Sequence, residues 1–251
     1  MQYLDLGSTS LSDEGLQSFV EGMSNCCRLK ELHLSYNRSI TANGVASLSS
    51  MFRAEHCSLC TLALYNIHFG DEGAIALANG LIGNKSLTDL RFSVESVTAR
   101  GWDAFSTLLC DTSSVNNTYL SNHTLTEIGN YHTPLDIKDC LELNMKLNYS
   151  NSHNQATAIC KILRSHPDID VTPLFEFNLM CLPLVVAWFE KAKLYLGEVN
   201  EPAEVFKNRK LSAMFKFIRG MPKLAADGYY GKKKAKSKKR NRSDQTLCDI
   251  S

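Results

Sequence analysis

The chain has 251 residues, with 44% apolar and 21% charged side chains and a formal net charge of +1. This length allows one or two domains with a sizeable core, and the composition is that of an ordinary soluble globular protein. Residues 1–10 lack a charged and apolar leader, and the longest apolar run, residues 179–189, is too short for a bilayer. We therefore expect neither a secretory signal nor a membrane span.

Five glycines recur at nearly constant spacing. They are Gly15, Gly44, Gly73, Gly101 and Gly129, separated by 29, 29, 28 and 28 residues. An L-x-x-L-x-L pattern lies upstream of each glycine and predicts a short strand that buries one side. Its positions are Met1, Leu4 and Leu6; Leu29, Leu32 and Leu34; Leu59, Leu62 and Leu64; Leu87, Leu90 and Phe92; and a weakened Val115, Thr118 and Leu120.

A predicted helix start accompanies each glycine. Three residues before it stands a residue of a capping type, and apolar residues follow it at helical spacing. The capping positions are Ser12, Thr41, Gly70, Thr98 and Thr126. Each unit is therefore predicted to form a strand, a turn, a capped helix and a return loop. Because one unit cannot bury its apolar face alone, stacked units would share one continuous core.

The period, the strand pattern and the S/T-x-x-G helix start resemble the ribonuclease-inhibitor type of leucine-rich repeat. Asn37 and Asn66 sit where that family places a strand-ending asparagine. The resemblance covers about residues 1–130 and implies an α/β fold. It would be a right-handed solenoid of about five strand–helix repeats, with a parallel sheet on its concave face and helices on its convex face.

The array is assigned to residues 1–133, because the apolar spacing fails after Gly129. Its first repeat begins at Met1 with nothing before it to cover its apolar side. Solenoids normally end in a polar cap, so either another segment or chain covers this end or the start is truncated.

Residues 134–221 are predicted to form a small helical region that caps the array. Its first helix would bury Ile137, Leu141 and Met145, and a second, within 151–167, would bury one face that includes Ile159. The next segment, residues 172–197, is apolar nearly all round up to Phe189 and should be central, with Pro183 dividing or kinking it. A last helix would use Phe206, Met214 and Ile218, and residues 222–251 are expected to be disordered.

The concave face is the predicted binding surface, because strand residues between buried leucines point outward. Five strands at ~4.8 Å spacing make a band roughly 20 Å wide, which suits a peptide or helix of another protein. The alternative is that these residues are merely solvated. The candidate partner-binding residues are Tyr3, Asp5, Glu31, His33, Tyr65, Asp89, Arg91 and Tyr119.

Catalysis and metal binding find little support. The chain has no P-loop, dinucleotide fingerprint, nucleophile elbow or H-E-x-x-H motif. His56, Cys57 and Cys60 have ligand chemistry, but no second C-x-x-C lies nearby, and a zinc site needs four ligands. We predict no catalytic residue, no metal and no cofactor, and therefore a non-enzymatic protein.

Residues 232–242 hold eight of the 27 Lys and Arg residues, which leaves 19 against 26 Asp and Glu elsewhere. This basic tail is interpreted as a nuclear-import signal, a nucleic-acid-contacting arm or a solvated end. Nine cysteines without a secretory signal favour the cytoplasm or the nucleus. The basic residues are Lys232, Lys233, Lys234, Lys236, Lys238, Lys239, Arg240 and Arg242.

The leading hypothesis is a protein-binding scaffold or adaptor that uses the concave face. The alternative is a nuclear protein whose basic tail contacts nucleic acid or import factors. The family resemblance also permits a GTPase-regulator-like repeat protein, although no residue pattern assigns that role. Repeat folds carry many functions, so the fold does not choose between them.

Overall fold

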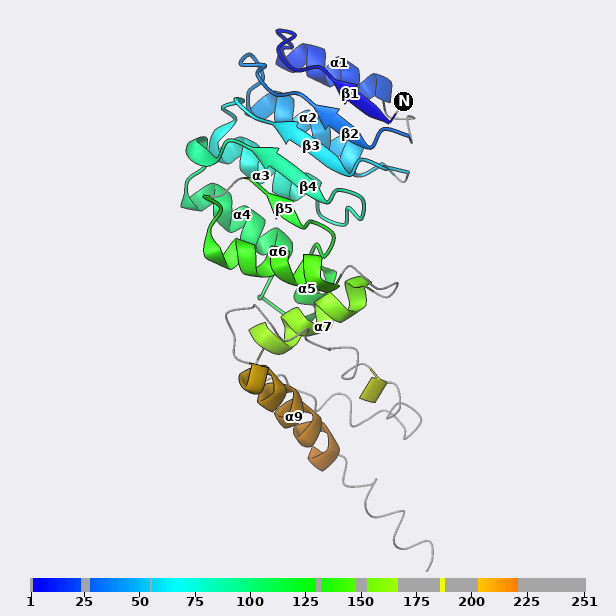
Figure 1. Cartoon of the computed structure of the whole chain (residues 1–251), viewed down its shortest axis with the longest axis vertical. Coiled ribbons are helices and arrows are strands. Elements are labelled where there is room, and N and C mark those ends of the chain that lie inside the picture. Colours follow the sequence, from blue (N-terminus) through cyan, green and yellow to red (C-terminus); the bar gives the residue numbers. More distant parts are fainter. Residues whose placement is uncertain are drawn as a thin grey trace, which may run out of the picture.

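The computed structural model describes residues 2–23, 28–54, 56–129, 132–147, 153–166, 186–187 and 203–220. Strands and helices alternate through its first part (Figure 1). The strands are β1 (Tyr3–Asp5), β2 (Glu31–His33), β3 (Thr61–Leu64), β4 (Asp89–Phe92) and β5 (Glu127–Ile128). The helices are α1 (Asp13–Met23), α2 (Ala42–Phe52), α3 (Gly70–Gly80), η1 (Val94–Ser96), α4 (Ala99–Leu109), α5 (Val115–Leu120), α6 (Leu135–Leu147), α7 (His153–Ser165) and α9 (Ala203–Gly220).

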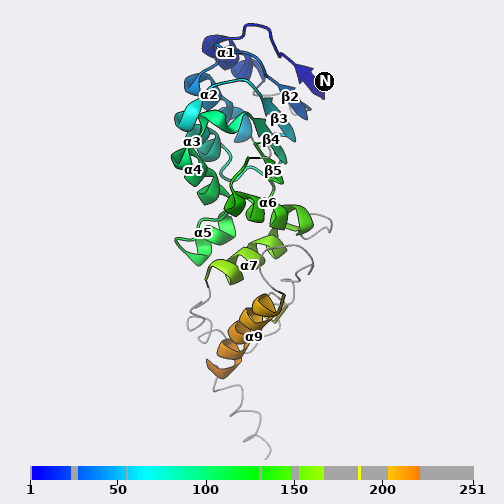
Figure 2. The ribbon, with the colours of Figure 1, turned by 60° about the vertical axis from the view of Figure 1, so that its left-hand side comes forward.

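The five strands form one parallel sheet in sequence order, which confirms the predicted parallel sheet with helices. Leu4, Leu32, Leu62, Leu90 and Ile128 occupy the same register position in successive strands. The helices α1 to α4 stack on one side of the sheet and leave its other side uncovered by helices (Figure 2). We call that uncovered side the strand face.

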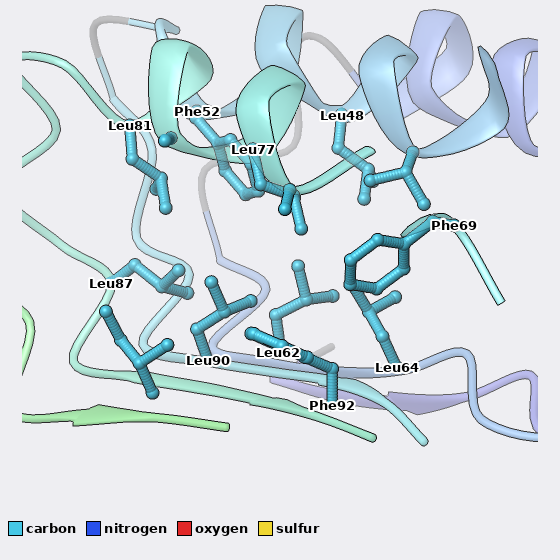
Figure 3. Close-up of a cluster of buried hydrophobic side chains, with 14 of the residues drawn as sticks. Leu48, Phe52, Leu62, Leu64, Phe69, Leu77, Leu81, Leu87, Leu90 and Phe92 are labelled. Carbon is cyan, nitrogen blue, oxygen red and sulfur yellow. The ribbon is translucent and has the colours of Figure 1, made fainter. Parts of the chain in front are cut away.

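The core lies between the sheet and the helices. Leucines from β3 and β4 point upward in Figure 3 and meet Leu48, Leu77 and Leu81 from the helix layer. All three, with Leu62 and Leu90, are fully buried, so the predicted leucine column exists. Burying a side chain of this size contributes about 1.5–3 kcal/mol, and each repeat contributes several such side chains to one shared core.

The fifth repeat begins later than the sequence pattern predicted. Residues 115–120 form helix α5 and not a strand, so the prediction of a fifth strand there is wrong. The strand is β5, where Ile128 pairs with Leu90 and Leu125 is fully buried. Leu87 and Leu125 are 38 residues apart, so the fourth unit is about ten residues longer than the others and α5 occupies the added length.

This shift changes the role of two predicted helix-start residues. Gly129 follows β5 with φ +72° and starts no helix, because that backbone conformation suits a turn. Thr126 lies beside the strand and donates its main-chain N–H to Thr88 O at 2.9 Å. The helix of the fifth repeat is α6, which packs beside α4 and buries Ile137 and Leu141 in the array's core.

Two junctions between neighbouring helices are closed by the same polar contact, here called the carboxylate clasp. Asp13 in α1 accepts the main-chain N–H and hydroxyl of Thr41 at 2.7 and 2.6 Å. Asp71 in α3 accepts the same two groups of Thr98, at the same distances. The clasp joins the start of one helix to the cap residue of the next and satisfies an N–H beside each helix start.

The clasp also accounts for glycine at two of the recurring positions, Gly44 and Gly101. A Cβ added to Gly44 would overlap Asp13 Oδ1, and one added to Gly101 would lie 2.7 Å from Asp71 Oδ1. In both repeats the glycine therefore leaves room for the preceding repeat's carboxylate. At Gly73 the neighbour is instead Phe69 of the same repeat.

The predicted strand-ending asparagine is present once. Asn37 is fully buried and its amide donates to Leu6 O at 2.7 Å and Leu34 O at 2.9 Å. Its oxygen accepts from the N–H groups of Thr9 and Leu11 at 3.1 and 2.9 Å. One side chain thus satisfies four main-chain groups across two repeats.

Asn66 does not repeat this arrangement, so that assignment is wrong. Asn37 lies three residues after Leu34, and the equivalent position after Leu64 is Ile67, which is fully buried. Asn66 lies one residue earlier, with φ 59°, a conformation that asparagine tolerates in turns.

The helices after the array match the predicted faces at some, but not all, of the positions whose side chains are described. Ile159 and Leu163 of α7 are buried, whereas Met145 of α6 is 45% exposed and outside the predicted buried face. In α9, Met214 is half-buried and Ala213 is buried. The side chains of Phe206 and Ile218, and all of 172–197 except 186–187, lie outside the described residues, as does 222–251.

Candidate protein-binding face

The strand face presents two rows of side chains. The first row crosses the sheet through Tyr3, Glu31, Thr61, Asp89 and Glu127, which are neighbours in the strand register. The second row crosses it through Asp5, His33, Ala63 and Arg91. Six of the eight predicted binding residues therefore lie together in these rows.

Arg91 is held between two carboxylates. Its Nη2 lies 3.1 Å from Asp89 Oδ1 and 3.7 Å from Glu127 Oε2. Burial and the adjacent Asp89 carboxylate raise the pKa of Glu127 above its ordinary value, against the opposing charge of Arg91. The guanidinium is therefore fixed in place, and 38% of the Arg91 side chain stays exposed.

The other end of the strand face is aromatic and acidic. The rings of Tyr3 and His33 lie 5.1 Å apart between centroids, and Tyr3 is 52% exposed. Glu31 Oε2 is 3.9 Å from His33 Nε2. The Tyr3 hydroxyl donates to Asp5 Oδ2 at 3.4 Å, a long bond between exposed groups. A partner at this end would meet an open aromatic ring beside two carboxylates.

Ala63 does not face open space, contrary to the prediction that outward strand residues would be accessible. It is 2% exposed because its neighbours in the second row are His33 and Arg91, whose longer side chains stand on either side of a single methyl group. The middle of the strand face is therefore low, with higher side chains on both sides.

Tyr65 follows directly after β3 and is 36% exposed. Tyr36 lies three residues after the end of β2, donates its N–H to Tyr65 O at 2.8 Å and is 59% exposed. The sequence analysis missed Tyr36, which lies two residues after Leu34, whereas Tyr65 lies one residue after Leu64. Together they add two tyrosines to the same end of the sheet.

Tyr119 does not belong to the strand face, so its assignment there is wrong. It lies on α5, in the stretch that the sequence pattern mistook for the fifth strand. Glu127 takes its place on the strand face. The seven-residue pattern of residues 84–90, NKSLTDL, recurs as NHTLTEI at 122–128 and would have located this strand.

Helix α5 forms a separate surface with two hollows. A hollow of about 400 Å³ lies against α3, α4 and α5, and a second of about 200 Å³ lies on the other side of α5. Ile82 lines the larger hollow and Leu120 lines both, and these side chains are 62% and 63% exposed. This apolar surface is the natural comparison for the strand face in binding experiments.

The remaining candidate residues either make ordinary hydrogen bonds or lie outside the described residues. Cys57 accepts a hydrogen bond from Ser86 Oγ at 3.4 Å, and Cys60 Sγ lies 3.4 Å from Ser58 O. Across the described residues, no three His, Cys, Asp or Glu side chains converge in a way that could hold a metal ion. None of the described helices is long and apolar enough to cross a membrane. The basic tail, 232–242, lies outside the described residues.

Comparison with known proteins places the repeats in a recognised class. A leucine-rich-repeat family model matches residues 1–20 and 25–49. The human NACHT, LRR and PYD domains-containing protein 5 is 35% identical over 101 residues, which is 40% of this chain and 8% of that protein. The first two repeats of this chain are thus similar to leucine-rich repeats. The matched part spans far less than two thirds of the relative, so its whole-protein activity is not carried over.

A solved structure, leiomodin-1 actin-binding site 2, matches with a TM-score of 0.48 and 18% identity. The match covers 58% of this chain and 82% of that chain. A likeness of this degree carries no argument about what this chain binds. Leucine-rich repeats in general are non-catalytic protein-binding modules, and this description fits a strand face of fixed, partly exposed side chains.

Proposed function

We propose that the chain is a non-catalytic protein-binding scaffold that holds a peptide or helix of another protein on its strand face. The observation that carries this proposal is the two rows of side chains in register, one across five strands and the other across four. Tyrosine and arginine are enriched among residues that anchor protein interfaces, and both stand partly exposed here.

The binding mechanism is preorganisation. The strands are held by a continuous core, and Arg91 is already oriented by Asp89 and Glu127 before a partner arrives. A side chain that is fixed in advance loses less conformational entropy on binding, which for a long side chain amounts to about 0.5–1.5 kcal/mol.

The strand face also favours a particular charge on its partner. The five strands carry four carboxylates, Asp5, Glu31, Asp89 and Glu127, against the single guanidinium of Arg91. A segment with exposed lysine or arginine would be attracted to such a surface, and salt would weaken that attraction.

The test is a capture experiment with three matched variants. The strand-face variant combines Tyr3→Ala, Tyr65→Ala and Arg91→Ala, and the α5 variant carries Leu120→Ser. The control, Glu72→Ala with Arg100→Ala, removes an exposed ion pair on the helix side. We expect partners to be lost from the strand-face variant alone. An unchanged partner set would refute the proposal, and loss from the α5 variant alone would move the site there.

A second candidate function rests on the composition of residues 232–242. Eight cationic side chains in eleven residues attract phosphates without sequence preference, and such clusters also serve as nuclear-import signals. We infer a nuclear as well as cytoplasmic location on this ground. Deleting 232–242 should then abolish nuclear residence, whereas a strand-face variant should leave it intact. Retention of the deletion variant in the nucleus would contradict the inference.

A further inference from the structure

Helix α9 has an outer side that no other described element covers. On its inner side Ala213 is buried, and Arg209 Nη1 donates to Arg164 O of α7 at 3.3 Å. Among the described elements, α9 packs closely only against α7. Figures 1 and 2 place α9 beyond α7, at the opposite end of the described structure from β1. Its outer side is therefore open to another molecule.

The outer side of α9 combines apolar and cationic side chains. Leu211 and Phe215 are 52% and 62% exposed, and Lys207, one turn before Leu211, is also exposed. Residues four positions apart lie on the same side of a helix, so these three form one row, here called the α9 stripe. The sequence of α9 contains five Lys and Arg residues and a single carboxylate, Glu204. A basic helix with two exposed large apolar side chains is typical of a segment that docks in a groove of another protein.

The strand face has a low strip that suits such a helix. The strip runs along β3, where Thr61 and Ala63 have short side chains and Ala63 is 2% exposed. Neighbouring strands lie ~4.8 Å apart, so β2 and β4 are roughly 10 Å apart, which leaves room for the side chains of one helix. Longer side chains of β2 and β4 form a wall on each side of the strip. In register they are Glu31 and His33 on β2, and Asp89 and Arg91 on β4.

The charges of the two surfaces are opposite. Glu31 and Asp89 place a carboxylate in each wall of the strip. The positive charge of Arg91 is already balanced by its contacts with Asp89 and Glu127. Across the whole strand face, four carboxylates stand against one guanidinium, whereas the α9 stripe brings the ammonium group of Lys207. Opposite charges steer the two surfaces together, and salt weakens that attraction.

The strand face that receives α9 belongs to a second copy of the chain. Within one copy, α6 and α7 lie between α9 and the sheet (Figure 1). The contacts of Ala213 and Arg209 hold the inner side of α9 on α7, so the α9 stripe points away from α7. While α9 stays packed in this way, the two surfaces can meet only between molecules.

We propose that the chain self-associates, with the α9 stripe of one copy seated over the β3 strip of a second copy. Leu211 and Phe215 cover the strip, and Lys207 meets the carboxylates in its walls. This inference rests on the proposed function, because it uses the same strand face and names one partner for it.

The contact joins two different surfaces, so one copy can bind another at each of its ends. Such heterologous contacts extend into open chains or close into a ring. The contact is small, because α9 with its 18 residues is about 27 Å long and the five strands span roughly 20 Å. Interfaces below about 1,200 Å² belong to weak and transient complexes, so we expect reversible association at micromolar concentrations. While α9 of a second copy is bound, the strand face is closed to other partners.

The first experiment measures the sedimentation velocity of the whole chain over a range of concentrations. We expect the sedimentation coefficient of the parent chain to rise with concentration, and to rise less at high salt. Two variants should stay monomeric: the strip variant, Glu31→Lys with Thr61→Arg, and the α9 variant, Leu211→Ser with Phe215→Ser. All four positions are exposed or half-buried, so the fold is retained. The α5 variant, Leu120→Ser, is the control, because it removes an equally exposed apolar side chain elsewhere, and it should associate as the parent chain does.

The second experiment mixes the strip variant with the α9 variant. The first retains a working α9 and the second a working strand face. The mixture should therefore form a pair of chains and nothing larger, although each variant alone is monomeric. A mixture that stays monomeric, or a parent chain that is monomeric at every concentration, would overturn the proposal. Loss of association in the α5 variant would overturn it as well.

These outcomes are separate from those of the capture experiment on the strand face. A monomeric parent chain whose strand-face variant still loses its captured proteins would remove the self-association and leave the proposed function standing. A monomeric parent chain that sediments with vesicles of phosphatidylserine and phosphatidylcholine, and an α9 variant that does not, would instead assign the α9 stripe to an anionic membrane surface.

Discussion

Replacing Asn122 with alanine should destabilise the junction between the array and the helices that follow it. Its amide donates to Leu81 O and Asn84 O, both at 3.2 Å, and its oxygen accepts from Thr124 N at 2.9 Å and Leu125 N at 3.0 Å. The residue is 4% exposed, so water cannot easily replace these partners.

The magnitude follows from these four bonds. A neutral intramolecular hydrogen bond contributes about 0.5–1.5 kcal/mol net, and a buried group left without a partner costs about 1–3 kcal/mol. We therefore expect Asn122→Ala to lower the free energy of unfolding by about 4 kcal/mol, a large fraction of the 5–15 kcal/mol typical of a domain.

The effect should also be local, because a repeat contacts mainly its neighbours. Lys161 and Asn144 donate to Asn122 O, so the loss should spread to α6 and α7 before it reaches α1. Urea unfolding followed by circular dichroism measures the total, and hydrogen exchange measures its distribution. Asn116→Ala, on an exposed position of α5, is the control and should change stability by less than about 0.5 kcal/mol. A loss below about 1 kcal/mol for Asn122→Ala, or equal loss of protection in α1, would refute the reasoning.

Three further predictions concern other parts of the array. Burial, with the nearby Lys161 charge, lowers the pKa of His123 to about 4, so the unfolded chain takes up a proton between pH 6.5 and 4 that the folded chain refuses. The His123 contribution to the free energy of unfolding should be fully present above pH 6.5, and the free energy should fall by about 3 kcal/mol on acidification to pH 4. Urea unfolding at each pH measures this dependence, and His123→Gln should reduce it between pH 6.5 and 4. Gly44→Ala should cost about 1–3 kcal/mol by displacing the Asp13 carboxylate, whereas Gly22→Ala, with open space around it, should stabilise by about 0.5–1 kcal/mol; equal melting shifts would contradict the clasp. Glu127→Gln should weaken capture of a lysine-rich partner at low salt more than at high salt, and a salt-independent loss would argue against charge attraction.

The array was predictable because its apolar period is long and regular. Leu32, Leu62 and Leu90 fall in one register, and sequence spacing alone places them there. The fifth strand was missed because residues 115–120 match the strand pattern loosely, while the preceding Asp111, Ser113 and Ser114 form the turn and cap of a short helix. Local hydrogen bonds outweighed a weak apolar match.

The binding face was predictable only in part. Outward positions follow from strand alternation, but whether such a residue is accessible depends on the length of its neighbours, which is why Ala63 is buried. The buried lysine belongs to no sequence pattern either. Lys161 and Leu109 are 52 residues apart, and only the fold brings the Lys161 ammonium group to the Leu109 carbonyl oxygen.

The carboxylate clasps join the repeats in pairs. The first and third units share Asp-Glu-Gly at 13–15 and 71–73, while the second and fourth share Thr-Ala-x-Gly at 41–44 and 98–101. The seam between units two and three has alanine and glycine at the matching places, Ala42 and Gly70, neither of which has a side chain able to form such a link. The array is thus built from pairs of repeats. Adding an odd number of repeats would leave one half of a clasp without its partner residue.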